Sequence, residues 1–364
     1  MIEVSSLQKI VRVLLFLFLL IAGLIYAKPF LVPVVFAALL AMLFLPISNW
    51  LERKGIHRAL TALICILILA AVVAGIIWLF IWQLSDLAKD ADQIEQNLLK
   101  KQKEFSKFLG ETFGISVQKQ QEVLKDQQGS TTGKLGDSIT RILRGVGGFL
   151  TNFLLVLVYI FLFLYYRLHL KKFILLLVKK DDREASGEIM HSAEKVIQKY
   201  LTGLALMIVG LWIMYSIGFS MVGVKNAIFF AILCGLLEIV PFVGNLVGNL
   251  ITIITTLAQG GSMNMIVGIL ITYALVQFIQ TYFLEPLVVG AEVNINPLFT
   301  IAGIVVGELI WGIAGMIVAI PLLGFAKIIC DHVESLKPYG YLMGDERKKP
   351  KRSFRKKIKS PVSQ

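Results

Sequence analysis

Three carboxylates lie within or beside long apolar stretches in the C-terminal half of the sequence, at Glu238, Glu285 and Glu308. An ionisable side chain at the centre of a bilayer costs at least about 2.5 kcal/mol on insertion scales, so each of these residues needs an explanation. A carboxylate in such a place can bind a cation, or it can accept a proton and lose its charge. The alternative is a position at a helix end near the lipid headgroups, where water solvates the carboxylate.

Four amides in the same region of the sequence are candidate ligands. Asn245 and Asn249 are four positions apart and therefore share one face of a helix, and Gln277 and Gln280 lie in the next apolar stretch. Together with backbone carbonyls freed by a helix break, these amides could coordinate a cation or form hydrogen bonds with a polyol. Polar side chains also join membrane helices to one another, and that is the more ordinary explanation for the two glutamines.

Two of the apolar stretches, 227–258 and 297–330, are too long to cross a membrane once as straight helices. About 32 helical residues extend over roughly 48 Å, whereas the hydrocarbon core of a bilayer is about 30 Å thick. Each stretch therefore tilts strongly or breaks. The residues that favour a break are Pro241, Gly244 and Gly248 in the first stretch, and Gly307, Gly312, Gly315 and Pro321 in the second.

The two long stretches also match each other, because Glu238 lies twelve positions after Asn226 and Glu308 lies twelve positions after Asn296. If each stretch is a re-entrant hairpin, the first returns to the outer side and the second to the inner side, which makes the two halves inverted repeats. Inverted repeats with broken helices near the bilayer midplane recur in secondary transporters. Eight simple crossings agree equally well with the distribution of positive charge.

The elements that must position these groups are apolar helices. Of the 364 residues, 57% are hydrophobic and only 16% are charged, whereas an average soluble domain carries about 25% charged residues. A transmembrane helix needs about 20 consecutive apolar residues. Such runs lie near 10–27, 30–48, 60–83, 145–166, 201–222, 227–258, 263–286 and 297–330. The sequence predicts an all-α polytopic membrane protein with six to eight spans, in which two broken or re-entrant helical hairpins form an inverted repeat.

Positive charge sets the expected orientation. Lys and Arg cluster before the first run, after the second, after the fourth and after the last. Because such residues are retained on the cytoplasmic side, both termini are expected there. Much of the net charge of +12 lies in the tail from Arg347 to Lys359, where a basic cluster attracts anionic lipid. A solvated tail explains this cluster equally well, and nucleic acid is not an expected partner.

The C-terminal half contains the motifs Pro241-x-x-Gly244-x-x-x-Gly248, Glu285-Pro286-x-x-x-Gly290, Asn296-Pro297 and Trp311-Gly312-x-x-Gly315 with Pro321. These motifs resemble those of the autoinducer-2 exporter family, and the likeness extends over essentially the whole chain. It implies a bacterial inner-membrane permease, because some relatives are assigned to export of autoinducer-2 and others look like sodium or lithium/proton antiporters. Family members usually carry an aromatic or polar residue where this chain has Glu238, which favours ion coupling here.

The chain divides into five segments. Apolar residues at three-four spacing from Leu84 to Phe108 form a coiled-coil-like seam, which packs either on its own domain or on the same helix of a neighbouring subunit. A homo-oligomer is expected, and the second of these two packings would be one of its contacts. The segments are helices one to three (1–83), an extracytoplasmic helical and loop segment (84–141), the fourth span with a cytoplasmic amphipathic helix (142–200), the core with the inverted repeat (201–330) and the basic cytoplasmic tail (331–364).

These observations favour a secondary transporter that lies in the lipid bilayer and either exports a small polar solute or exchanges Na⁺ or Li⁺ for H⁺ across it. The alternatives are a passive channel built from the oligomer and a structural membrane protein. The four histidines do not cluster with Cys or carboxylates at metal-ligand spacing, and no Gly-x-Ser-x-Gly elbow occurs, so neither an enzyme nor a cofactor beyond H⁺ or Na⁺ is expected. The predicted substrate and ion site comprises Glu238, Pro241, Gly244, Asn245, Gly248, Asn249, Gln277, Gln280, Glu285, Glu308, Gly312 and Gly315.

Overall fold

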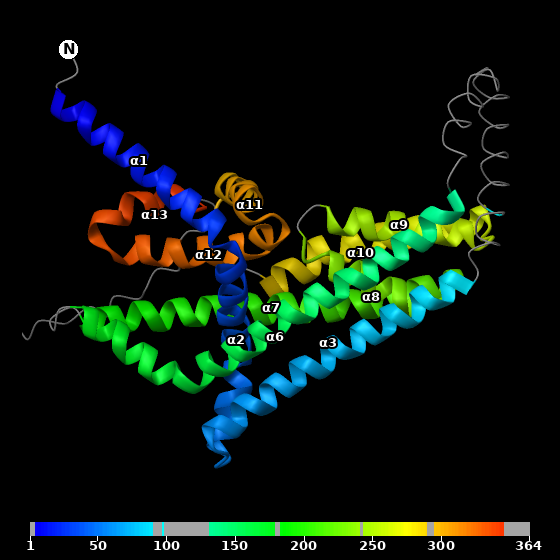
Figure 1. Ribbon diagram of the computed structural model, residues 1–364, viewed down its shortest axis with the longest axis horizontal. Helices are drawn as coiled ribbons and strands as arrows, with labels where there is room; N and C mark the ends of the chain where they lie inside the picture. Colours follow the sequence, from blue (N-terminus) through cyan, green and yellow to red (C-terminus); the bar gives the residue numbers. More distant parts are fainter. Residues whose placement is uncertain are drawn as a thin grey trace, which may run out of the picture.

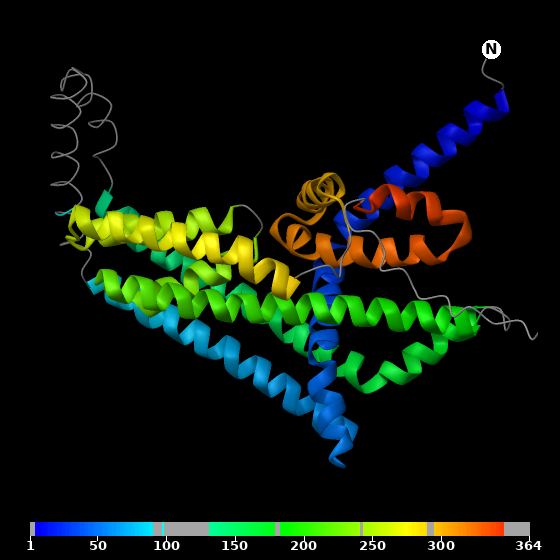
Figure 2. The same cartoon turned by 180° about the vertical axis from the view of Figure 1, so that it is seen from behind.

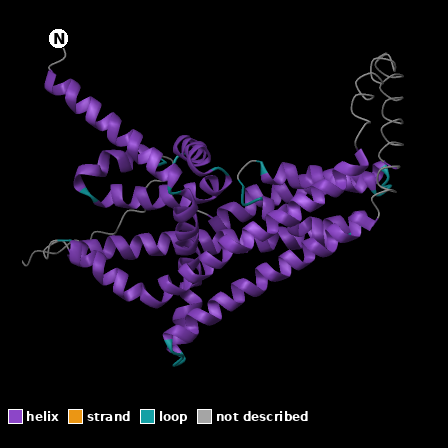
Figure 3. Ribbon diagram, viewed as in Figure 1, coloured by secondary structure: helices purple, strands orange, loops and turns teal. Residues whose placement is uncertain are grey.

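The computed structural model describes residues 4–89, 97, 131–178, 183–240, 243–289 and 295–345. Every regular element within these ranges is a helix (Figure 3). Seven of the described helices are long and apolar enough to cross a membrane, which confirms the predicted all-α polytopic class. Most of the predicted 84–141 segment, Pro241, Gly290 and residues 346–364 of the basic tail lie outside the described residues.

The N-terminal helices are long, and three of them extend along the long dimension of the molecule. Figure 1 shows α3, α6 and α7 in this direction, whereas α2 runs across them. α2, α3 and α6 pack together through small side chains such as Ala37, Ala41 and Ala62, which allow close approach of the backbones. The helices are α1 (Val4–Tyr26), α2 (Lys28–Arg53), α3 (Arg58–Lys89), α6 (Thr131–Leu177) and α7 (Arg183–Val222).

α7 differs from the sequence prediction in its length. A cytoplasmic amphipathic helix and a separate span beginning at 201 were predicted, but the two form one continuous helix from Arg183 to Val222. No Pro or Gly separates Lys199 from Leu201, so nothing in the local sequence ends the helix there.

The first long stretch folds back on itself as a helical hairpin, as predicted. α8 (Ala227–Leu237) and α9 (Gly244–Ala258) lie against each other, and two glycines of α9 make this contact possible. A Cβ at Gly244 would lie 1.6 Å from the carbonyl oxygen of Leu237, and one at Gly248 would lie 3.0 Å from Cys234 Cα. α10 (Met263–Ile279) then returns along the molecule and continues as a π-helix, Gln280–Val289.

The second long stretch is also a hairpin, formed by α11 (Pro297–Trp311) and α12 (Ile313–His332). Gly312 makes the turn with φ of +68°, a backbone conformation that favours glycine. A Cβ at Gly315 would lie 1.8 Å from the carbonyl oxygen of Gly307. The backbones of the two helices are therefore in direct contact at these two glycines. The last described elements are a short 3₁₀ turn, Glu334–Leu336, and α13 (Lys337–Met343).

α7 supports both hairpins, but at different levels. Its C-terminal half buries Leu211 and Tyr215 in one apolar cluster with α8, whereas Ile197 in its N-terminal half packs with Trp311 and Val318 of the second hairpin. Figures 1 and 2 accordingly show α8, α9 and α10 toward one end of the molecule and α11, α12 and α13 toward the other. The prediction that the stretches 227–258 and 297–330 each break into a helical hairpin is confirmed.

Candidate ion and solute site

Glu238 lies at the tip of the first hairpin, as the C-cap residue of α8. Its Oε1 atom accepts a hydrogen bond of 2.7 Å from Nε2 of Gln280. Its Oε2 atom is buried and has no hydrogen-bond partner within the described residues. No described Lys or Arg forms an ion pair with Glu238, so a neutral amide is the partner that the structure gives this carboxylate.

Gln280 is placed by a change of helix type. α10 ends at Ile279 and the π-helix begins at Gln280, which is only 2% exposed. A π-helix has wider hydrogen-bonded turns than an α-helix and is frequently found at functional sites. The Oε1 atom of Gln280 is buried and also lacks a partner within the described residues. Glu285, on the same π-helix, lies near Gln280 and Glu238 but is exposed.

A row of polar side chains joins α7, α9 and α10 beside this carboxylate. Asn245 Oδ1 accepts hydrogen bonds from the hydroxyl of Tyr215 and from Nδ2 of Asn249, each of 2.8 Å. Asn245 Nδ2 donates to Oε1 of Gln277, and Gln277 Nε2 donates to Oγ1 of Thr281 at 3.4 Å. Asn249 Oδ1 is buried without a partner among the described residues.

This arrangement supplies oxygen atoms to a ligand. Oε2 of Glu238, Oε1 of Gln280 and Oδ1 of Asn249 are buried acceptors without donors in the part of the chain that the structure describes. A buried acceptor without a donor is unfavourable by about 1 to 3 kcal/mol, so such groups normally have a partner. Small hard cations bind to carboxylate and amide oxygens, and a proton on Glu238 would satisfy its open oxygen equally well. The sequence grouped Glu238, Asn245, Asn249, Gln277 and Gln280, and the structure brings them together.

The second hairpin does not contribute to this cluster. Glu308 is exposed on α11, and within the described residues its side chain makes no hydrogen bond or ion pair. Gly312 forms the turn and Gly315 packs against Gly307, so both glycines have a structural reason for being there. Trp311 at this tip donates a hydrogen bond of 3.0 Å to the carbonyl oxygen of Leu24, which joins the tip to the end of α1. A role of these residues in binding stays a prediction.

Gly244 and Gly248 are likewise explained by the close contact of α8 and α9, and Pro241 lies outside the described residues. Sequence reasoning missed Tyr215, which is fully buried on α7 and hydrogen-bonded to Asn245. The available signal was a lone tyrosine inside an apolar run, because a buried phenol hydroxyl usually finds a hydrogen-bond partner. Thr252 was missed as well, and its hydroxyl contacts Cys234 Sγ at 3.8 Å.

Comparison with known proteins gives the class and the family. The molecule is a multi-pass membrane protein with broken helical hairpins, and the sequence profile of the AI-2E family transporters matches residues 14–335. The chain belongs to this family and is a membrane transporter rather than an enzyme.

Similar proteins occur in distant bacteria. YrrI of Bacillus subtilis (strain 168) is 22% identical over 318 residues, which cover 84% of this chain and 87% of YrrI. YhhT of Escherichia coli (strain K12) is 23% identical over 338 residues, covering 92% and 93% of the two chains. MT0215 of Mycobacterium tuberculosis is 25% identical over 302 residues, covering 81% and 80%. Each of the three is named as a candidate transport protein.

Proposed function

We propose that this protein is a secondary transporter that exchanges Na⁺ or Li⁺ for H⁺, and that Glu238 is the group that binds either cation. The observation that carries the proposal is the half-buried carboxylate of Glu238, with one oxygen held by Gln280 and the other buried without a partner among the described residues. A buried carboxylate without a cationic partner is unfavourable as long as it is charged. Taking up a proton or a metal cation removes that cost.

The geometry favours competition between the two cations. A proton on Oε2 of Glu238 makes the group neutral and removes its attraction for Na⁺. After the proton leaves, Oε2 and the open Oε1 of Gln280 supply oxygen ligands for Na⁺ or Li⁺. Gln280 donates to the other carboxylate oxygen in either case and fixes the orientation of the group. A single site that holds one cation or the other is sufficient for exchange when it opens alternately to the two sides.

A second candidate is the export of a small polar solute resembling autoinducer-2. The row of Tyr215, Asn245, Asn249 and Gln277 supports it, because hydroxyl and amide groups form hydrogen bonds with a polyol. The two activities are compatible, since the cation could drive the solute through the adjacent row.

The proposal includes a cellular location and an orientation in the membrane. We expect the bacterial inner membrane with both termini in the cytoplasm. Basic residues lie at the turn between α2 and α3, where two candidate spans meet, and Arg167, Lys171 and Lys172 lie in the C-terminal part of α6. Assembly into a homo-oligomer is part of the same proposal.

Flux into proteoliposomes tests the function. Purified protein is reconstituted, a pH gradient is imposed, and the movement of ²²Na⁺ is followed with and without Li⁺ in the medium. An exchanger accumulates Na⁺ against its concentration gradient only while the pH gradient lasts, and the flux saturates with Na⁺. A Na⁺ flux that does not saturate and does not depend on the pH gradient would indicate a channel instead. Gradient-driven movement of a labelled polyol without Na⁺ movement would favour the second candidate.

A further inference from the structure

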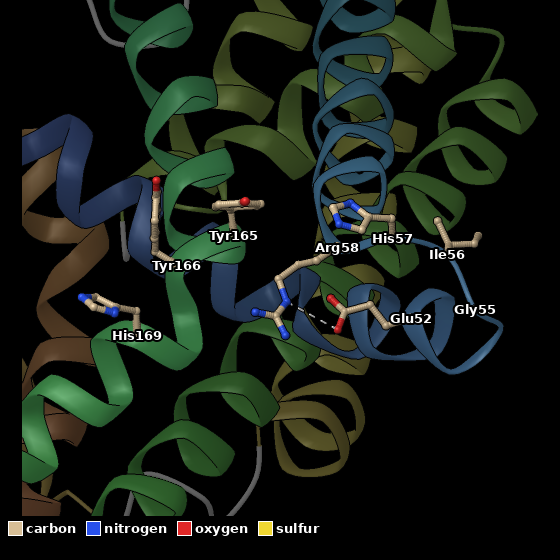
Figure 4. A pocket seen from close by; sticks show the side chains of 8 residues that line it. All are labelled: Glu52, Gly55, Ile56, His57, Arg58, Tyr165, Tyr166 and His169. Atoms are coloured by element: carbon tan, nitrogen blue, oxygen red, sulfur yellow. Dashed lines mark ion pairs between the residues drawn. The ribbon is translucent and has the colours of Figure 1, made fainter.

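A second polar pocket lies at the turn between α2 and α3, outside the hairpin site. It has a volume of about 520 Å³. Figure 4 shows side chains of this turn on one side and side chains of α6 on the other, with the guanidinium group of Arg58 between them. The polar residues that line it are Glu52, His57, Arg58, Tyr165, Tyr166 and His169.

The charge of Glu52 is already matched by a residue outside the pocket lining. Arg167 Nη2 donates to Glu52 Oε2 at 2.7 Å, and Ser48 Oγ donates to Oε1 at 3.4 Å. Arg58 Nε lies farther away, at 3.9 Å from the same Oε2 atom. This Nε atom is buried and has no hydrogen-bond partner within the described residues. One positive charge with unused donors therefore remains in the pocket.

Several of the other lining groups can also donate hydrogen bonds. Nδ1 of His57 accepts a hydrogen bond of 3.3 Å from the backbone N–H of Ala59, so the neutral ring carries its proton on Nε2. Tyr165, Tyr166 and His169 line the opposite wall, and a tyrosine hydroxyl or an imidazole N–H is able to donate to a ligand. An arginine fork surrounded by further donors matches the oxygens of a phosphate group in charge and in geometry.

The pocket lies where a membrane surface must be. The candidate spans Lys28–Arg53 and Arg58–Gln83 end and begin at this turn. Trp50 beside it is 54% exposed, and Nζ of Lys54 lies 3.8 Å from the centroid of the Trp50 ring. Trp and Tyr are enriched at the level of lipid headgroups, which is the level that the two tyrosines of the pocket also share.

Exposed apolar side chains lead away from the pocket along the span. Leu155, Val158 and Leu162 lie on the same face of α6 as the pocket residues Tyr166 and His169, and are 44%, 49% and 38% exposed. An acyl chain attached to a phosphate in the pocket would run along this face. A soluble phosphate would gain nothing from it, so the surroundings favour a lipid as the source of the phosphate group.

We propose that this pocket binds the phosphate group of an anionic phospholipid, with Arg58 as its principal contact and His57 and His169 as further donors. Glu52, held by Arg167, positions Arg58 without neutralising it. The site is independent of the identity of the transported species, because no residue of the hairpin cluster lines it.

Thermal unfolding of the purified protein in detergent tests this proposal. Dioleoylphosphatidylglycerol, dioleoylphosphatidylcholine and inorganic phosphate are titrated separately. A ligand that binds only the folded state raises the unfolding temperature with concentration. The wild type should respond to phosphatidylglycerol, and Arg58→Gln should need about tenfold more of it for the same shift, because a charged hydrogen-bond donor is lost. Arg53→Gln removes the same charge from an exposed position outside the lining and should respond as the wild type does.

The other arms separate the sources of the phosphate. Phosphatidylcholine, which has no net charge, should act more weakly than phosphatidylglycerol. Inorganic phosphate that alone produces the Arg58-dependent shift would overturn the lipid as the ligand. If Arg58→Gln does not fold, His169→Gln on α6 replaces it, with an expected loss of about threefold. Equal responses of the wild type, the pocket variant and Arg53→Gln to phosphatidylglycerol would overturn the site.

Discussion

Nε2 of Gln280 donates a hydrogen bond of 2.7 Å to Oε1 of Glu238 and so joins the first residue of the π-helix to the tip of the α8–α9 hairpin. The two residues are 42 positions apart in the sequence. The bond fixes one carboxylate oxygen and leaves the other open to a ligand. The amide of Gln280 therefore decides how the carboxylate faces a cation.

Gln280→Ala tests this relationship. Without the amide, Glu238 loses the donor that orients it, and a hydrogen bond to a charged group is worth about 1.5 to 3 kcal/mol. We expect the Na⁺ concentration at half-maximal exchange to rise by about tenfold or more in proteoliposomes. Gln259→Ala, at the C-terminal end of α9, is the control and should behave as the wild type does. Unchanged Na⁺ dependence in Gln280→Ala would remove the amide from the site.

Tyr215→Phe separates the polar row from the carboxylate. The change removes the hydroxyl that donates to Asn245 at 2.8 Å but keeps the buried ring. We expect a loss of about 1 kcal/mol in stability, seen as a lower unfolding temperature in detergent, while Na⁺/H⁺ exchange continues. Solute export, if it uses the row, should fall. An exchange activity as low as that of an inactive Glu238 variant would instead make Tyr215 part of the cation site.

Gly244→Ala tests the closure of the first hairpin. The new methyl group would lie 1.6 Å from the carbonyl oxygen of Leu237, a backbone atom that cannot move away without separating α8 from α9. We expect the protein to lose about 1 to 3 kcal/mol of stability, and exchange to fall with it. The matched control is Gly75→Ala in α3, where no atom lies within 4 Å of the new methyl group, and its stability should hold or increase slightly. Equal stability of the two variants would contradict the packing of this hairpin.

Labelling of single cysteines tests the orientation. With Cys65, Cys234 and Cys330 replaced, Ser262→Cys lies between α9 and α10, on the side to which the first hairpin returns. We expect it to react with an impermeant maleimide added to intact cells, whereas Arg53→Cys at the end of α2 should react only after the membrane is opened. The opposite pattern would place the termini outside, and reaction of both residues from one side would contradict the path of the chain between them.

The sequence predicted both hairpins because their causes are local. Pro and Gly interrupt stretches that are too long for one crossing, and such interruptions can be recognised without knowing the neighbours. The same local reasoning selected Glu238, since a carboxylate within an apolar stretch can be recognised from the sequence alone. It also correctly placed Asn245 and Asn249 on one face of a helix.

What the sequence could not supply were contacts across long separations. Gln280 reaches Glu238 through a π-helix, which no local pattern marks, and Tyr215 meets Asn245 through the packing of α7 against the hairpin. The equal spacing of Glu238 and Glu308 within their stretches suggested equal surroundings. Glu308 is nevertheless exposed, because the second hairpin packs against a different part of α7.

The most direct test of the account is Na⁺/H⁺ exchange by Glu238→Gln in proteoliposomes. The glutamine keeps the size of the side chain and an oxygen that can accept from Gln280, but it can neither titrate nor carry a charge. We expect gradient-driven Na⁺ uptake to fall to the level of empty liposomes, while the unfolding temperature holds or rises because a buried charge has been removed. Glu184→Gln, an exposed carboxylate in the first turn of α7, should retain full activity. Wild-type uptake by a folded Glu238→Gln protein would contradict the claim that this carboxylate binds the exchanged cation.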